Sequence, residues 1–177
     1  MKPVLAVIDM QQVFADPDSN WYTPRFAEVV PPIRRLVAEF GDRVVFTRFV
    51  APPEPAGAWS DYYRDWRFAL QPPDAPLYAV VPDFAPGKTL DATTFGKWGA
   101  PLADRMGGAD TLVLAGVSTD CCVLSTALAA ADAGVRVRVV ADACAGMTDR
   151  THAEALDVMA LYTPHIQVTD TAELLGP

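Results

Sequence analysis

Two adjacent cysteines, Cys121 and Cys122, stand where the sequence pattern changes from strand to helix. The apolar run 111–115 leads into them and the small-residue run 124–131 leads away. This pattern is typical of a buried strand followed by a helix that packs closely on a sheet. Helix amides and the helix dipole at such a turn favour a thiolate, which makes Cys122 a candidate nucleophile. The alternative is that both cysteines are small buried apolar residues.

A second candidate is Asp9, which directly follows the apolar run 4–8. Ligands of open parallel sheets bind beyond the carboxyl ends of the strands, so we expect Asp9 and Cys122 at the same edge of a sheet. Asp142 ends a later apolar run and is expected at that edge too. A desolvated carboxylate there is suited to accept a proton. The alternative role for Asp9 is to cap a helix or to bind loop amides.

Alternating strands and helices are predicted to hold these residues. The pattern predicts a helix over 33–40 that starts at Pro31 and Pro32, a helix after Cys122 and a helix over 150–161. Strands are predicted over 4–8, 44–46, 112–115, 135–140 and 165–168. This alternation indicates one α/β domain, 1–177, with a parallel sheet covered on both faces. Residues 51–88 hold many prolines and aromatics and are predicted to be an ordered insertion within that domain.

The composition excludes several functional classes. The chain has 177 residues with 51% hydrophobic and 20% charged residues, and no apolar run approaches the roughly 18 residues of a membrane helix. A net charge of −8 argues against nucleic acid and anionic membranes as partners. Residues 1–9 lack a signal-peptide pattern, and three cysteines without such a signal indicate a cytoplasmic protein with reduced thiols. With two histidines and no C-x-x-C pair, we expect neither a metal nor another cofactor.

Two segments resemble the motifs of the isochorismatase-like cysteine hydrolases. Val-Ile-Asp-Met-Gln-Gln-Val-Phe at 7–14 is similar to the opening motif of that family, and Gly-Val-Ser-Thr-Asp-Cys-Cys-Val at 116–123 is similar to its nucleophile motif. Residues 126–127 and 139–143 and His152 also fit, in the family's order. The resemblance implies a Rossmann-like three-layer α/β/α fold with a mostly parallel six-stranded sheet. It further implies a triad of aspartate, lysine and cysteine.

In that triad the resemblance assigns Asp9 as the aspartate and Cys122 as the nucleophile. It implies a cis peptide between Val117 and Ser118, and an oxyanion hole formed by the amides of Ser118 and Cys122. The implied reaction is hydrolysis of an amide-type C–N bond of a small molecule through a thioester, by a homo-oligomer (a dimer or a tetramer). Two alternatives stay open. One is a vinyl-ether hydrolase of the isochorismatase type, which would need Asp9 and tolerate loss of Cys122; the other is an inactive binding homologue.

The lysine of the triad is where the chain departs from the family pattern. Counting back from Trp98 and Leu102 places the lysine position on Ala92. On that register the chain is an engineered lysine-to-alanine variant or a natural member with impaired activity. The other interpretation is a shifted register in which Lys97 or Lys88 reaches the site. Lys97 is otherwise expected to be a solvated cation near the start of a helix.

A set of aromatic residues and one arginine is expected to bind the substrate, with the alternative that they pack in the core or at a subunit interface. This set consists of Phe14, Arg48, Trp59, Tyr62, Trp66 and Trp98. Nicotinamidases of the superfamily hold a metal with histidines near the second strand, whereas this chain has Thr-Arg-Phe at 47–49. Nicotinamide is therefore a disfavoured substrate.

Overall fold

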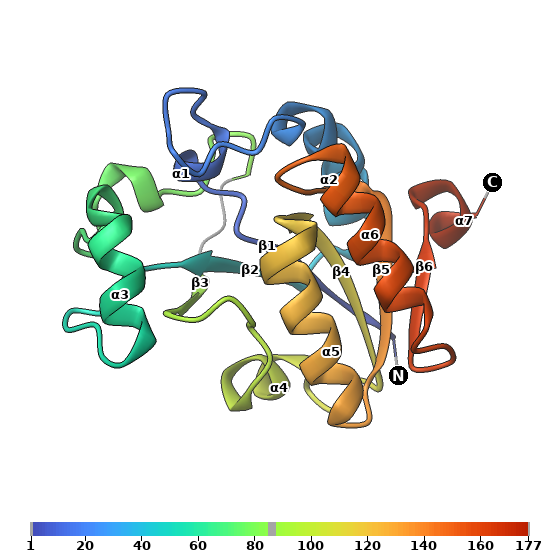
Figure 1. Cartoon of the computed structure of the whole chain (residues 1–177). Helices are drawn as coiled ribbons and strands as arrows, with labels where there is room; N and C mark the ends of the chain where they lie inside the picture. The colour runs from blue at the N-terminus through green and yellow to red at the C-terminus, as the bar shows by residue number, and fades with distance from the viewer. Residues whose placement is uncertain (1, 85–87, 177) are drawn as a thin grey trace.

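A computed structural model describes residues 2–84 and 88–176 (Figure 1). Its centre is a six-stranded sheet in the order β3-β2-β1-β4-β5-β6, and every neighbouring pair is parallel. The strands are β1 (Val4–Ile8), β2 (Val44–Phe49), β3 (Thr89–Ala92), β4 (Thr111–Val117), β5 (Arg136–Ala145) and β6 (Ile166–Thr169). The winding reverses between the neighbours β1 and β4, and such a switch point is where open sheets bind ligands.

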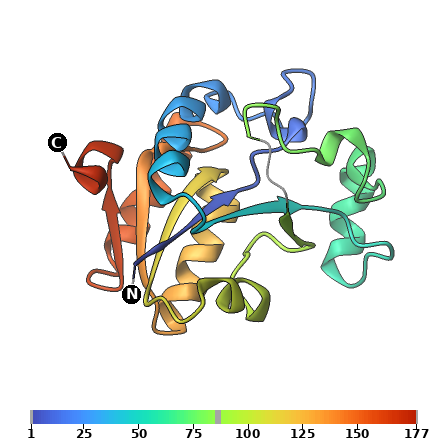
Figure 2. The same ribbon diagram turned by 180° about the vertical axis from the view of Figure 1, so that it is seen from behind.

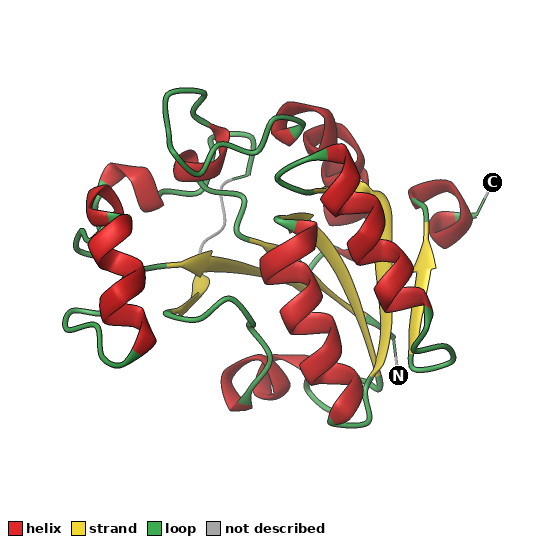
Figure 3. Cartoon of the chain, viewed as in Figure 1, coloured by secondary structure: helices red, strands yellow, loops and turns green. Residues whose placement is uncertain are grey.

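Helices cover both faces of this sheet, as Figures 2 and 3 show. One face carries α2 (Phe26–Phe40) and α7 (Thr171–Leu175), and the other carries α4 (Ala100–Met106), α5 (Leu124–Asp132) and α6 (Asp149–Ala160). Alternate residues of a strand point to opposite faces. Leu5 and Val7 of β1 accordingly join the cluster around α2, whereas Ala6 and Ile8 join the cluster around α4 and α5. The unbroken apolar run of β1 follows from this double burial, and the expected three-layer fold is confirmed.

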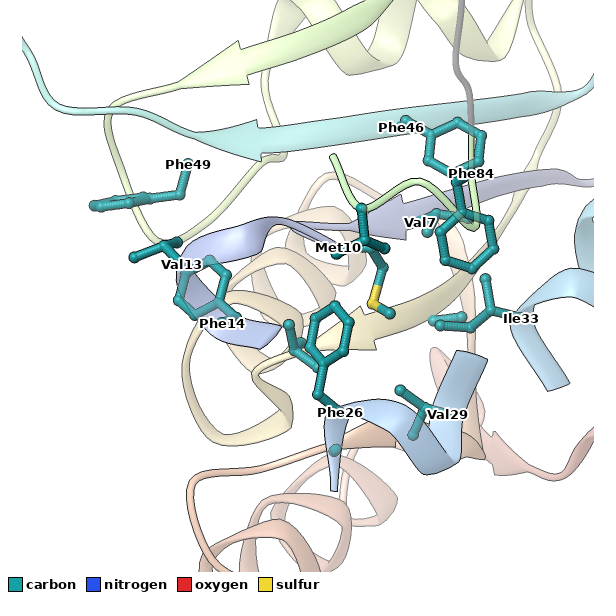
Figure 4. Packing of buried hydrophobic residues seen from close by; sticks show 14 of the residues in the cluster. Val7, Met10, Val13, Phe14, Phe26, Val29, Ile33, Phe46, Phe49 and Phe84 are labelled. Carbon is teal, nitrogen blue, oxygen red and sulfur yellow. The ribbon is translucent and has the colours of Figure 1, made fainter. Parts of the chain in front are cut away.

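The helix α2 begins earlier than its prolines suggested. It starts at Phe26, so Pro31 and Pro32 lie inside it and the predicted start at these prolines is wrong. Each proline removes one helical hydrogen bond. The helix nevertheless runs through them because it buries one continuous apolar stripe, which includes Phe26, Val29 and Ile33. Figure 4 shows this stripe against the side chains of β1, β2 and the 79–84 segment.

The segment between β2 and β3 is ordered over its described part. It forms α3 (Ala58–Asp65) and two 3-10 helices, Arg67–Ala69 and Pro76–Tyr78. Its buried side chains Tyr63, Ala69 and Tyr78 belong to the same cluster as those of β1 and α2. Residues 85–87 of the expected insertion, Pro86 among them, lie outside the described residues. Among the helices of the described ranges, none has the length and apolarity needed to span a membrane.

The strand β5 extends further than the apolar pattern predicted, from Arg136 to Ala145. Asp142 therefore lies inside the strand and does not end it. Its Oδ1 accepts hydrogen bonds from the amide (2.8 Å) and the hydroxyl (2.9 Å) of Thr171 at the start of α7. The expectation that Asp142 stands at the ligand edge beside Asp9 is wrong, because its carboxylate anchors the last helix.

A glycine permits the close approach of β1 and β4 at the switch point. Gly116 pairs with Ile8 and has a φ of +115°, and a Cβ added to it would lie 2.1 Å from the carbonyl oxygen of Ile8. No other residue type fits there without moving one of the two strands. The turns that carry Asp9 and Cys122 leave the sheet directly after this pair.

We therefore predict that Gly116→Ala lowers the free energy of unfolding by at least about 3 kcal/mol, because it adds a backbone clash to an unfavourable φ. Gly107→Ala is the matched control: Gly107 also has a positive φ, +55°, but nothing lies within 4 Å of an added Cβ. The control should lose only about 1–2 kcal/mol. Urea denaturation of both variants measures the difference, and equal losses would contradict the close approach.

Candidate active site

Asp9 is held by the neighbouring strand β2. Its side chain is fully buried, and it directly follows β1 in a left-handed conformation with φ 49°. The hydroxyl of Thr47 donates a hydrogen bond to Asp9 Oδ1 over 2.7 Å and accepts one from the Asp9 amide over 3.2 Å. The carboxylate is therefore fixed in orientation by a side chain of β2 and does not cap a helix.

A lysine completes the environment of this carboxylate. The Nζ of Lys97 lies 2.9 Å from Asp9 Oδ2, and both side chains are fully buried. The same ammonium donates to the carbonyl of Thr94 over 2.8 Å and lies 5.0 Å from the centre of the Phe49 ring. These contacts offset part of the cost of burying a cation.

The assignment of the lysine position to Ala92 is therefore wrong. Ala92 is the last residue of β3 and pairs with Phe49 in the sheet. Residues 93–99 form a loop that returns to the sheet edge before α4 begins at Ala100, and Lys97 enters the site from this loop. The count from Trp98 and Leu102 assumed a fixed spacing that this loop does not keep. Lys97 is a buried ion-pair partner and not a solvated cation.

The hydroxyl of Thr126 connects the lysine loop to the cysteine turn. It accepts a hydrogen bond from the Lys97 amide over 2.9 Å and donates one to the Cys122 carbonyl over 2.6 Å. Thr126 is fully buried at the start of α5. One side chain thus sets the position of Lys97 relative to Cys122.

Cys122 lies in a turn of π-helix, Thr119–Val123, between β4 and α5. Cys122 is 4% exposed. The peptide between Val117 and Ser118, which precedes this turn, is cis, as the resemblance implied. Burial raises the pKa of the Cys122 thiol well above its usual value; the charge of Asp9 and a hydrogen bond to Asp9 act in the same direction, and Lys97 opposes them. Burial beside a carboxylate thus opposes the thiolate that the helix end was expected to favour. The site holds a neutral thiol beside Asp9.

A narrow pocket opens onto this thiol. It contains about 390 Å³ of empty space, the open solvent at its mouth included. Its lining consists of Phe14, Trp21, Phe49, Tyr62, Phe95, Ser118, Cys121, Cys122 and Met147. Phe14 and Tyr62, two of the residues expected to bind the substrate, are among them. Phe49 and Phe95 were not expected to line a pocket, although Phe49 ends β2 at the ligand edge and Phe95 precedes Lys97 by two residues.

Four expected binding residues lie outside this lining. Arg48 donates hydrogen bonds to Asp91, over 2.8 Å from Nε to Oδ1, and to the carbonyl of Pro73. Trp59 packs behind the Phe95 ring, and Trp66 packs edge-on against Trp21. Trp98 packs in the cluster around α4 and α5. The three tryptophans thus pack against other side chains, and Arg48 is held in an ion pair.

The start of α6 supports one wall of the pocket. Asp120 Oδ2 accepts hydrogen bonds from the Met147 amide, over 3.0 Å, and from the Thr151 hydroxyl. Nδ1 of His152 forms a 2.8 Å hydrogen bond with the hydroxyl of Thr119. Burial and the charge of Arg25 lower the pKa of His152. The three hydrogen bonds of Asp120 and His152 hold the cysteine turn against the loop that brings Met147 to the pocket.

Metal-binding side chains do not gather at this site. Within the ranges 2–84 and 88–176, no group of three or more His, Cys, Asp and Glu side chains could hold a metal ion.

The doubly wound sheet, with a cysteine, a carboxylate and a lysine gathered at its switch point, defines an α/β domain with an enzyme-like site. Residues 3–173 match the model of the isochorismatase domain. The chain therefore belongs to the isochorismatase family of hydrolases.

Three known proteins are similar over nearly the whole chain. The maleamate amidohydrolase of Pseudomonas putida is 29% identical over 189 residues, which cover 98% of this chain and 87% of that protein. The N-carbamoylsarcosine amidase of Thermoplasma acidophilum superposes with a TM-score of 0.77 at 25% identity and covers 99% of this chain and 100% of its own. A cysteine hydrolase of Pseudomonas syringae has the same fold, with a TM-score of 0.82 at 22% identity over 98% of this chain and 90% of its own.

We predict that Lys97→Met destabilises the protein by about 3–5 kcal/mol, because it leaves the Asp9 carboxylate buried without its partner. The double variant Asp9→Asn with Lys97→Met removes both charges and should recover most of that loss. Chemical denaturation of wild type, both single variants and the double variant gives the coupling free energy. A double variant no more stable than Lys97→Met would contradict the buried ion pair.

Proposed function

We propose that this protein is an amidohydrolase that uses Cys122 to cleave the C–N bond of a small carboxamide through a thioester. The observation that carries the proposal is the buried cluster of Asp9, Lys97 and Cys122, of which Cys122 lines the pocket. It combines a nucleophile, a base that can take its proton, and a cation that balances the charge of the base.

Acylation begins from the neutral thiol. Asp9 accepts the proton of Cys122 as the sulfur attacks the carbonyl carbon, so the thiolate forms only during the attack. In this proposal the amides of Ser118 and Cys122 stabilise the resulting oxyanion. Asp9 then gives the proton to the nitrogen, the C–N bond breaks, and an amine or ammonia leaves behind a thioester.

Deacylation uses the same carboxylate. Asp9 takes a proton from a water molecule, which attacks the thioester carbon and forms a second oxyanion. The C–S bond breaks, the proton returns to the sulfur, and a carboxylic acid is released. The ammonium of Lys97 stays within 2.9 Å of Asp9 Oδ2 and offsets the negative charge that Asp9 carries before each proton transfer.

Two relatives support an amide substrate: one is named a maleamate amidohydrolase and the other an N-carbamoylsarcosine amidase. The presence of Lys97 beside Asp9 supports an intact triad and argues against impairment through Ala92.

Ammonia release from a panel of small primary amides tests the proposal. We expect the wild type to release ammonia with turnover. In Cys122→Ala and in Asp9→Asn we expect kcat to fall at least about 1,000-fold, because each variant removes a member of one catalytic unit. Cys144→Ala is the control, since Cys144 is a buried thiol that bonds the Leu114 carbonyl outside the pocket lining. Its turnover should match that of the wild type.

The alternatives predict different results. Full activity in Cys122→Ala would contradict a thioester and favour an ether hydrolase that needs only Asp9. No ammonia from any amide with the folded wild-type protein would contradict amide hydrolysis.

A further inference from the structure

The pocket above Cys122 has a wall of aromatic rings. Phe49 and Phe95 stack with their centroids 5.9 Å apart, and Trp21 lies 5.8 Å from Tyr62 and 6.1 Å from Phe14. All five side chains line the pocket. Figure 4 shows Phe14 and Phe49 beyond the end of β1. Such a wall favours apolar and flat groups.

The rest of the lining carries no formal charge at neutral pH. Ser118 and Met147 do not titrate in this range, and no Asp, Glu, Lys, Arg or His is among the described residues that line the pocket. Burial raises the pKa values of Tyr62, Cys121 and Cys122, so all three stay protonated and neutral. A charged substituent inside the pocket would therefore meet no opposite charge.

Three cations on segments that adjoin the site are already paired within the described residues. Lys97 is not part of the pocket lining and is bound to Asp9. Arg48, on β2, is bound to both carboxylate oxygens of Asp91. Arg25, which lies close enough to act on the pKa of His152, is bound to Glu28 and Asp149. Each of these ion pairs would have to break before the cation could serve a substrate carboxylate.

We propose that the pocket selects uncharged apolar carboxamides and rejects amides that carry a carboxylate. This inference rests on the proposed amide hydrolysis. It also separates the chain from the relative named a maleamate amidohydrolase, since maleamate carries a carboxylate. The cause is desolvation: a carboxylate that leaves water for a wall of aromatic rings gains no cation in return.

A pair of amides of matched shape tests the selection. In 4-methylpentanamide an isopropyl group takes the place of the carboxylate of succinamate. We expect kcat/KM for 4-methylpentanamide to exceed that for succinamate by at least about 100-fold at pH 7, the discrimination expected when a charge is left unpaired. The kcat/KM for the cationic 4-aminobutanamide should also be low, since the ammonium of Lys97, which already lies against Phe49, would repel a second cation. A preference for either charged amide would overturn the inference and leave amide hydrolysis standing.

A variant of the lining tests the cause. Met147 is 38% exposed at the pocket, so Met147→Arg can place a guanidinium there. We expect this variant to raise kcat/KM for succinamate at least about 10-fold, because the guanidinium can pair with the carboxylate of succinamate. Met147→Gln is the matched control, because it is polar and of similar length without a charge, and it should leave the preference unchanged. An equal gain in both variants would overturn the argument from charge.

Binding separates this inference from the proposed function. Calorimetry with Cys122→Ala measures the affinity of each amide without turnover. Tighter binding of 4-methylpentanamide than of succinamate supports the selection even if the wild type releases no ammonia, which would contradict amide hydrolysis alone. Equal binding, or no binding of either amide, would overturn the selection.

Discussion

The buried ion pair between Asp9 and Lys97 is the constraint on which the rest of the site depends. Two charges with fully buried side chains cost several kcal/mol each to desolvate, and a buried pair repays that cost only with good geometry and further hydrogen bonds. The hydroxyl of Thr47 and the carbonyl of Thr94 supply those bonds. The pair is thus weak evidence for stability, but it forces the ends of β1 and β2 and the 93–99 loop to meet at one point.

The topology of the sheet explains why Cys122 also reaches that point. Reversal of the winding places β4 beside β1, and Gly116 lets the two strands approach closely just before their turns. Thr126 then connects the cysteine turn to the lysine loop through one hydroxyl. Asp9 and Lys97 are 88 positions apart in the chain, and Lys97 and Cys122 are 25 positions apart. All three are nevertheless buried together at one point.

The elements that could be predicted from the sequence are those marked by a continuous apolar run. The runs 4–8 and 111–115 predicted the two central strands, and the rule for strand ends then placed Asp9 and Cys122 together. The short edge strand β3, Thr89–Ala92, was not predicted because only Leu90 in it is buried and no apolar run marks it. The helix α7 was not predicted because its anchor is the carboxylate of Asp142, which lies 29 positions before Thr171 in the sequence.

The remaining differences arise from contacts between distant segments. A loop of irregular length brings Lys97 to Asp9, and no local pattern marks where such a loop turns back. Trp21 and Met147 line the pocket through tertiary packing alone. A thiolate at Cys122 was predicted from the helix end, whereas burial and the charge of Asp9, which lies 113 positions away, raise the pKa of the thiol.

The central claim is that Cys122 rests as a neutral thiol whose proton Asp9 can accept. The pH dependence of alkylation tests this claim most directly. Iodoacetamide reacts with the thiolate, so a raised pKa keeps the native thiol unreactive until the pH passes well above the ordinary value near 8.5. Peptide mass spectrometry should show labelling of Cys122 that is slow at pH 7 and still rising above pH 9, with glutathione as the reference thiol. Labelling of Cys122 that is already at its maximum at pH 7 would show a resting thiolate and contradict the account.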